Sequence, residues 1–407
     1  MYDFAAMGAW IEFAVRWLHV ITGIAWIGSS FYFIALDLGL HRDRNLASGA
    51  DGEEWQVHGG GFYHIQKYLV APDNMPDGLI WHKWQSYWTW ISGFILLVLV
   101  YYLGAEFYLI DPAVADLAVW QAVGISLASL AFGWVIYNTL CRVFVDANQT
   151  TLMVALFGVL VVMSYFYTSV FSGRAAMLHL GAFTATIMSA NVFMIIIPNQ
   201  KIVVDDLIAG RTPDAKYGKI AKQRSTHNNY LTLPVIFLML SNHYPLAFAT
   251  QYTWLIASLV FLMGVTIRHY FNSIHARKGD PHWTWAVTTL IFILIMWLST
   301  APMFRAGEPE TAEGDALRFA QAEGFDAVQD IVLGRCSMCH AAEPVWKGLH
   351  WAPKGVRFET EYQIARQARE IYLHSGISHA MPPANLSYME EAERAQIVAW
   401  YLAATNS

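Results

Sequence analysis

Five consecutive residues near the C-terminus, Cys336-Ser337-Met338-Cys339-His340, have the C-x-x-C-H spacing that attaches haem c covalently. In such a site the two thiols bond to the haem, and the adjacent imidazole becomes an axial ligand of the iron. A zinc half-site is the alternative, but zinc needs a second ligand pair and no cysteine follows Cys339. The motif therefore predicts one haem c, held by Cys336 and Cys339, with His340 on its iron.

A methionine beside two prolines follows this motif, in the run His379-Ala380-Met381-Pro382-Pro383. A rigid turn can hold a thioether against iron, and a methionine ligand raises the reduction potential. Met381 is therefore the predicted second axial ligand, with His379 as its competitor.

Three further histidines lie within or at the ends of apolar stretches: His19, His179 and His243. Histidine inside a membrane is costly and is a functional candidate by default. Two of these three could ligate a haem b that relays electrons. The alternative is that each one only hydrogen-bonds a neighbouring helix.

A second group of chemically capable residues lies in and beside the predicted cytoplasmic loops. In the loop 53–83, three consecutive glycines stand between His58 and the aromatic pair Phe62 and Tyr63, and Lys67 follows. Glycines allow close backbone approach, and aromatic faces can stack on a planar ligand. A plain flexible loop is the alternative. The same group includes Arg224, His227, Asn228, Asn229 and His269.

The elements that must position these residues are membrane helices. Of the 407 residues, 56% are hydrophobic and only 14% are charged, a balance typical of a bilayer-embedded chain. The net charge of −6 gives no indication of nucleic-acid binding, and there is no phosphate-binding glycine motif. About eight stretches are long enough to span a bilayer: 10–36, 84–105, 117–141, 152–171, 175–198, 230–249, 252–273 and 283–304.

Lysine and arginine gather in alternate connections between these stretches, including Lys201, Arg211 and Arg277, whereas the opposite connections hold only Arg174. By the positive-inside rule the basic connections are cytoplasmic and both termini are periplasmic, in a bacterial inner membrane. The predicted fold class is all-α. It comprises a polytopic helical bundle at 1–305, a linker at 306–324, and a small cytochrome c-like helical domain at 325–407.

Three segments resemble the bacterial membrane-bound urate oxidases: the run from Trp55 to Trp90, the segment from Gln223 to Pro234, and Ser241-Asn242-His243-Tyr244-Pro245. That family joins an eight-helix domain to a C-terminal cytochrome c, so the resemblance covers essentially the whole chain. It implies oxidation of urate to 5-hydroxyisourate, with electrons passed to the cytochrome. It does not identify the catalytic residues.

From residue type and position, we expect urate to arrive from the cytoplasm and to be held by Arg224 or Lys67. Asn228 and Asn229 would pair with its ring, Phe62 or Tyr63 would stack on it, and His58, His227 or His269 would take a proton. The expected acceptor is a downstream cytochrome or terminal oxidase, and membrane lipid surrounds the bundle. The oligomeric state is not predicted. Two alternatives are a quinol-oxidising membrane cytochrome and a transporter or sensor with a redox-reporting domain.

Overall fold

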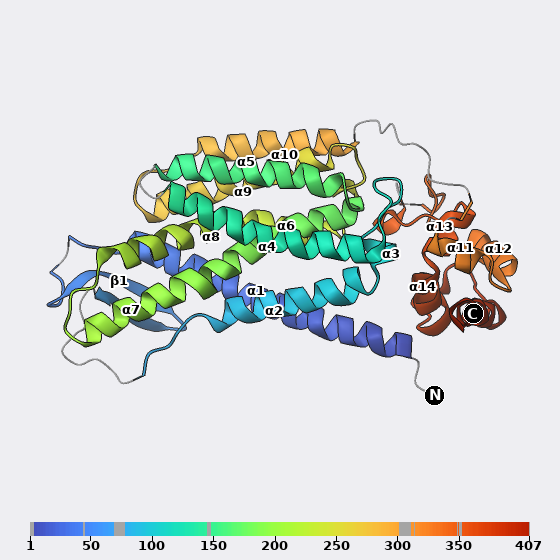
Figure 1. Cartoon of the computed structure of the whole chain (residues 1–407), viewed down its shortest axis with the longest axis horizontal. Coiled ribbons are helices and arrows are strands. Elements are labelled where there is room, and N and C mark those ends of the chain that lie inside the picture. The colour runs from blue at the N-terminus through green and yellow to red at the C-terminus, as the bar shows by residue number, and fades with distance from the viewer. Residues whose placement is uncertain are drawn as a thin grey trace.

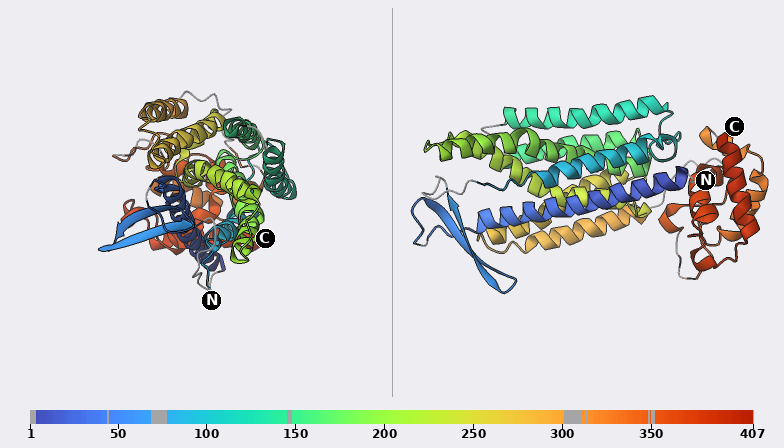
Figure 2. Two further views of the ribbon diagram at one scale, coloured as in Figure 1. Left: turned by 90° about the vertical axis from the view of Figure 1, so that its left-hand side faces the viewer. Right: turned by 90° about the horizontal axis from the view of Figure 1, so that it is seen from below.

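The computed structural model describes residues 4–43, 45–68, 78–144, 148–300, 311–312, 314–347, 349 and 352–406. It consists of a long helical bundle with a separate helical unit at one end and a β-hairpin at the other (Figures 1 and 2). The start of the first helix lies at the same end of the bundle as the C-terminal unit (Figure 1).

The bundle is formed by the first ten α-helices and the π-helical and 3-10 turns between them. Their bounds are α1 Phe4–Gly39, α2 Trp84–Leu96, η1 Leu97–Tyr102, α3 Ala105–Tyr108, α4 Val119–Val143, α5 Gln149–Thr168, α6 Gly173–Ala190, η2 Asn191–Ile196, α7 Ile197–Ile208, α8 Ala215–Ser241, η3 Pro245–Ala247, α9 Thr253–His275 and α10 Trp283–Thr300.

Six helices of the described residues are long and apolar enough to cross a membrane, whereas the sequence predicts about eight spans. These six are Ala6–Gly39, Val119–Val143, Gln149–Thr168, Gly173–Ile208, Thr253–His275 and Trp283–Thr300. The two other predicted spans, 84–105 and 230–249, fall on α2 with η1 and on α8. The predicted span at 230–249 also includes a turn, because α8 ends at Ser241.

The helices pack so that α8 lies between α6 and α9, with α4 and α5 against α6. Large apolar side chains fill this interior, among them Tyr167, Phe183 and Phe261. Other large apolar side chains point outward, and Trp120 is 76% exposed. An apolar exterior of this extent is a surface that lipid can cover.

The predicted fold class is all-α, but a β-hairpin occupies the first part of the loop 53–83, so the chain is not all-α. Strands β1 (Ala50–His58) and β2 (Gly61–Tyr68) pair antiparallel, with His58 opposite Gly61. The two residues that join them, Gly59 and Gly60, have φ of 58° and 81°. Two consecutive positive φ values suit a tight hairpin turn, which glycine adopts without strain. The glycines therefore make a turn in this structure.

The C-terminal unit has its own apolar core, which includes Phe319, Val332 and Trp400. Its elements are α11 Asp315–Ala320, α12 Phe325–Arg335, η4 Pro353–Gly355, α13 Glu361–Arg366, α14 Ala368–Ile371, η5 Tyr372–Ile377, η6 Pro383–Asn385 and α15 Glu391–Asn406. Helix α11 lies within the predicted linker 306–324, and the indole of Trp400 donates a hydrogen bond to the Phe319 carbonyl at 2.8 Å. The unit thus begins before residue 325. Residues 306–310 and 313 of the predicted linker lie outside the described residues.

Candidate functional site

The two motif cysteines lie on the turn that follows α12. Helix α12 ends at Arg335, and the amides of Cys339 and His340 both donate to the Cys336 carbonyl, at 3.1 and 3.0 Å. Both cysteines are free thiols, and burial raises the pKa of Cys336 to about 12. The turn therefore presents two free thiols from one short segment, which is what thioether attachment of a haem requires.

His340 is oriented by a single backbone contact. Its Nδ1 donates to the carbonyl of Val356 at 2.9 Å, and its ring packs at a tilt on Phe358. Burial lowers the pKa of His340, which keeps the imidazole neutral, while the bond to Val356 opposes that shift. With Nδ1 carrying the proton, Nε2 has a free lone pair, which is the state in which histidine binds a metal.

The backbone of Met381 is anchored by a buried arginine of α15. Arg394 donates to the carbonyls of Ser375 and Met381, at 2.5 and 3.0 Å, and the Met381 amide donates to the His374 carbonyl at 2.8 Å. The competing ligand, His379, is half-exposed, and its Nδ1 lies 3.9 Å from Oε1 of Glu391. By their chemistry, two thiols, an imidazole nitrogen and a thioether are the donor types that haem c takes.

Inside the bundle, the predicted site residues Arg224, His227 and Asn228 form one buried network with Tyr137 and Asn191. These five residues are here called the α8 cluster. The Nδ1 of His227 lies 2.8 Å from the Tyr137 hydroxyl, and the Asn191 amide donates to that hydroxyl and to the Asn228 oxygen. Arg224 donates to the Asn191 oxygen at 3.2 Å. Asn191 begins the π-helical turn η2, a backbone irregularity that recurs at functional sites.

Two atoms of the α8 cluster have no hydrogen-bond partner among the described residues. They are Nε2 of His227 and Nε of Arg224. The two residues are 1% and 3% exposed to solvent, respectively. A buried polar atom without a partner is costly, so such atoms indicate a place where a ligand, a water or a proton path meets the protein. Nε2 of His227 can exchange a proton, and Nε of Arg224 carries part of the positive charge of the guanidinium. Together these two atoms suit an organic anion.

Asn229 is directed to a different helix from its neighbour Asn228. Its side-chain oxygen accepts from Arg268 at 3.3 Å and from Asn272 at 2.9 Å, both on α9. Arg268 in turn lies over the ring of Phe31, 3.9 Å from its centroid. The two asparagines predicted to pair with one ligand therefore belong to separate contacts on α8.

The remaining predicted substrate residues lie apart from the α8 cluster. His58, Phe62 and Tyr63 are exposed at the tip of the hairpin, and Phe62 is 81% exposed. Lys67 is paired with Asp37 of α1, which also binds Lys222. His269 is exposed on α9, with Nδ1 3.4 Å from the Tyr230 hydroxyl. The structure thus does not bring the hairpin tip, His269 and the α8 cluster into one site.

The three histidines considered for a haem b have different surroundings. His179 is fully buried, and both of its ring nitrogens are engaged: Nδ1 with the Ala175 carbonyl at 2.8 Å and Nε2 with the Ser126 hydroxyl at 2.9 Å. In this arrangement His179 has no nitrogen for iron. His19 bonds the Thr89 carbonyl on α2 through Nδ1, and His243 is exposed in the turn after α8. A haem b stays a prediction.

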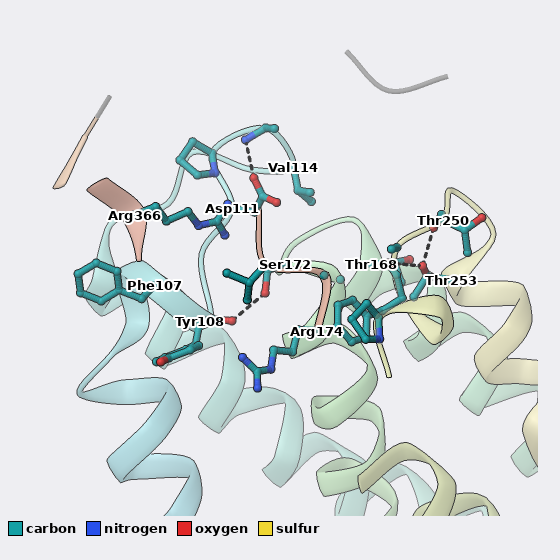
Figure 3. Close-up of a pocket in the computed structure, with 18 of the residues that line it drawn as sticks. Phe107, Tyr108, Asp111, Val114, Thr168, Ser172, Arg174, Thr250, Thr253 and Arg366 are labelled. Carbon is teal, nitrogen blue, oxygen red and sulfur yellow. Dashed lines mark hydrogen bonds between the residues drawn. The ribbon is translucent and has the colours of Figure 1, made fainter. Parts of the chain in front are cut away.

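A cavity that the sequence analysis did not anticipate lies where the bundle meets the C-terminal unit. This junction cavity, of about 1050 Å³, is lined by Tyr108, Arg174 and Trp254 of the bundle and by Val356 and Arg366 of the C-terminal unit, among others. Figure 3 shows Arg366 beside the loop at Asp111, with Tyr108 and Arg174 below them. The sequence feature that points toward this cavity is Arg174, the only lysine or arginine in the connections predicted to be periplasmic.

Comparison with known proteins identifies the bundle. Residues 5–299 match the family described as urate oxidase N-terminal, and the match ends with α10, before the C-terminal unit. No curated protein and no solved structure matches the chain. Because the matched segment is well over half of the chain, the protein belongs to the urate oxidase N-terminal family.

Proposed function

We propose that the chain is a membrane enzyme that oxidises urate and passes the electrons to a haem c in its own C-terminal unit. The family match over residues 5–299 carries the urate assignment. The C-x-x-C-H turn, the free Nε2 of His340 and the anchored Met381 support the acceptor. Together they favour a dehydrogenase over an enzyme that passes electrons directly to oxygen.

The proposed reaction balances as a hydroxylation by water. Urate monoanion and one water give 5-hydroxyisourate, one proton and two electrons. A bound haem c, held by Cys336, Cys339, His340 and Met381, would supply a one-electron acceptor. The protein must therefore bind an anion, remove a proton and exclude competing solvent.

The α8 cluster is the proposed urate site because it can perform the first two of these tasks. The free Nε–H of Arg224 can donate to an oxyanion, since an arginine keeps its charge even when buried. Nε2 of His227 accepts the proton when its Nδ1 carries the hydrogen that is shared with the Tyr137 oxygen. The amide of Asn228, fixed by Asn191 and by the Met188 carbonyl, keeps this wall of the site rigid.

A bacterial inner membrane is the proposed location, with the hairpin end in the cytoplasm and the C-terminal unit in the periplasm. Six apolar helices support the membrane setting. The orientation is supported by the lysines and arginines of the connections, including Lys201 and Arg211. Helix α7, which carries Lys201, lies at the end of the bundle opposite the C-terminal unit (Figure 1). A downstream cytochrome or terminal oxidase would then reoxidise the haem.

The decisive experiment adds urate anaerobically to the purified, oxidised full chain while its visible haem spectrum is recorded. We expect urate to reduce the c-type bands, and xanthine and allantoin to leave them oxidised. Reduction by a quinol but not by urate would overturn the assignment and make the chain a quinol-oxidising cytochrome. The same spectra would show any b-type band in the path.

A further inference from the structure

The side chains that line the junction cavity carry a net positive charge. Four basic side chains line it, Arg174, Lys354, Arg357 and Arg366, against two acidic ones, Asp111 and Asp116. Arg174 and Arg366 come from different halves of the chain, on α6 and α13. The net charge of the lining is therefore positive and comes chiefly from the C-terminal unit, so the cavity favours an anion.

The first turn of α6 adds to this field. Ser172, Gly173 and Arg174 all line the cavity, and the Ser172 hydroxyl caps the helix by accepting from the Ala175 amide at 3.3 Å. A helix N-terminus carries partial positive charge and favours negative ligands. The Nε of Arg174 is buried and has no hydrogen-bond partner among the described residues, while its guanidinium carbon lies 5.4 Å from the centre of the Tyr108 ring.

Aromatic side chains line the bundle side of the cavity. Phe107, Tyr108 and Trp254 line the cavity on the bundle side. Its volume of about 1050 Å³ is at the upper end of the range typical of small-molecule sites. Aromatic faces beside arginines are the surroundings in which a planar organic anion is held by stacking and charge together.

One wall of the cavity also orients the proposed haem ligand. Val356 lines the cavity, and its carbonyl accepts the Nδ1–H of His340 at 2.9 Å. Lys354, Gly355 and Arg357, its neighbours in sequence, line the cavity as well. A ligand that contacts this loop would alter the hydrogen bond that sets the basicity of His340, and outer-shell bonds of this kind tune a metal ligand.

We propose that the junction cavity is a second ligand site, which binds a small planar organic anion between Arg174 and Arg366 and modulates the haem through the Val356–His340 hydrogen bond. Binding itself is independent of urate oxidation. Only the spectroscopic effect rests on the proposed haem c. The site is separate from the α8 cluster, whose residues do not line the cavity.

Benzoate is the probe, with benzamide as the neutral ligand of the same shape and acetate as the small anion without a ring. Isothermal titration into the detergent-purified full chain should show one benzoate site and at least tenfold weaker binding of benzamide and of acetate. Benzoate should also shift the midpoint potential of the haem. No benzoate binding, or equal binding of benzamide, would overturn the proposal. Equal binding of acetate would overturn the planar requirement.

Two variants in different parts of the chain test the walls separately. Arg174→Gln and Arg366→Gln should each weaken benzoate binding roughly tenfold or more, because each removes a charge-assisted hydrogen bond. Arg318→Gln, an exposed arginine of the C-terminal unit outside the cavity, is the matched control and should bind benzoate like the unsubstituted chain. If Arg318→Gln weakens binding as much as the other two, the effect is one of net charge and the site is refuted.

Discussion

At the scale of single residues, two buried polar side chains of α8 have nitrogen atoms without a hydrogen-bond partner among the described residues. His227 has one engaged and one free ring nitrogen, and Arg224 has two engaged nitrogens and a free Nε, although both side chains are buried. Burying such atoms costs roughly 1–3 kcal/mol each unless something binds them. A purely structural role would be served better by apolar residues, so the free atoms favour a ligand site.

Replacing His227 tests the proton acceptor. We expect His227→Gln to slow urate-dependent haem reduction by about a hundredfold or more, since a positioned base contributes roughly 10²–10⁴-fold to rate. Covalent haem content should not change, because the cysteines lie in the other unit. Stopped-flow absorbance would measure the rate. His282→Gln, at an exposed histidine before α10, is the control. An unchanged rate in His227→Gln would remove this residue from the mechanism.

Replacing Met381 tests the axial ligand. Met381→His should lower the midpoint potential by on the order of 0.1 V, because a thioether favours the reduced iron more than an imidazole does. A spectroelectrochemical titration would measure it. His379→Gln should leave the potential near that of the unsubstituted chain. The opposite pattern, with the potential sensitive to His379 and indifferent to Met381, would exchange the two assignments.

At the scale of elements, α8 and α9 pass unusually close to each other. A Cβ added to Gly264 of α9 would lie 2.4 Å from Cδ of Pro234, which sits inside α8. The proline ring cannot move aside, so glycine at 264 is what allows the approach. Asn229 and Arg268 join the same two helices nearby, which makes this helix pair part of the framework of the α8 cluster.

Filling that contact should therefore destabilise the bundle. We expect Gly264→Ala to lower the stability by about 1–3 kcal/mol, the usual cost of overpacking a core. Thermal unfolding of the purified chain would show it as a lower apparent Tm. Gly158→Ala is the matched control, since a Cβ on that α5 glycine meets nothing within 4 Å. Equal Tm values for the two variants would show that α9 can shift without loss.

A helix can be predicted from the sequence where consecutive residues alone indicate it. Long apolar runs gave α1, α4, α5, α6, α9 and α10, because spanning length and composition are written in consecutive residues. The hairpin is not among the predicted elements although Gly59-Gly60 is a hairpin turn signal, because the same glycines also suit a loop that approaches a ligand closely. The division of Asn228 and Asn229 between two contacts depends on helix rotation, which adjacent positions in a polar run do not reveal.

At the scale of the whole molecule, the C-terminal unit is joined to the bundle by a few specific contacts. The Tyr108 hydroxyl of α3 donates to the Glu370 carboxylate of α14, and the rings of Phe107 and Phe319 lie 6.3 Å apart. The C-x-x-C-H motif is recognisable in the sequence because its residues are contiguous. The junction cavity is not, because Arg174 and Arg366 are brought together only by this docking. In the proposed function, electrons from the bundle to the proposed haem c would have to cross the same boundary.

The carboxylate at that boundary makes the docking sensitive to acid. Burial opposes ionisation of Glu370, but the hydrogen bonds from His374 and Tyr108 and the charge of Arg369 outweigh it and lower its pKa to about 2. A carboxylate with a depressed folded-state pKa stabilises the protein fully above its unfolded value of about 4.5, and that stabilisation is lost as the pH falls toward about 2. The apparent Tm of the full chain should therefore drop between pH 5 and 3. Glu370→Gln should flatten this part of the profile, whereas Glu323→Gln, at an exposed carboxylate of the same unit, should keep it. If Glu370→Gln retains the full acid slope, Glu370 is not the group that fastens the C-terminal unit to the bundle.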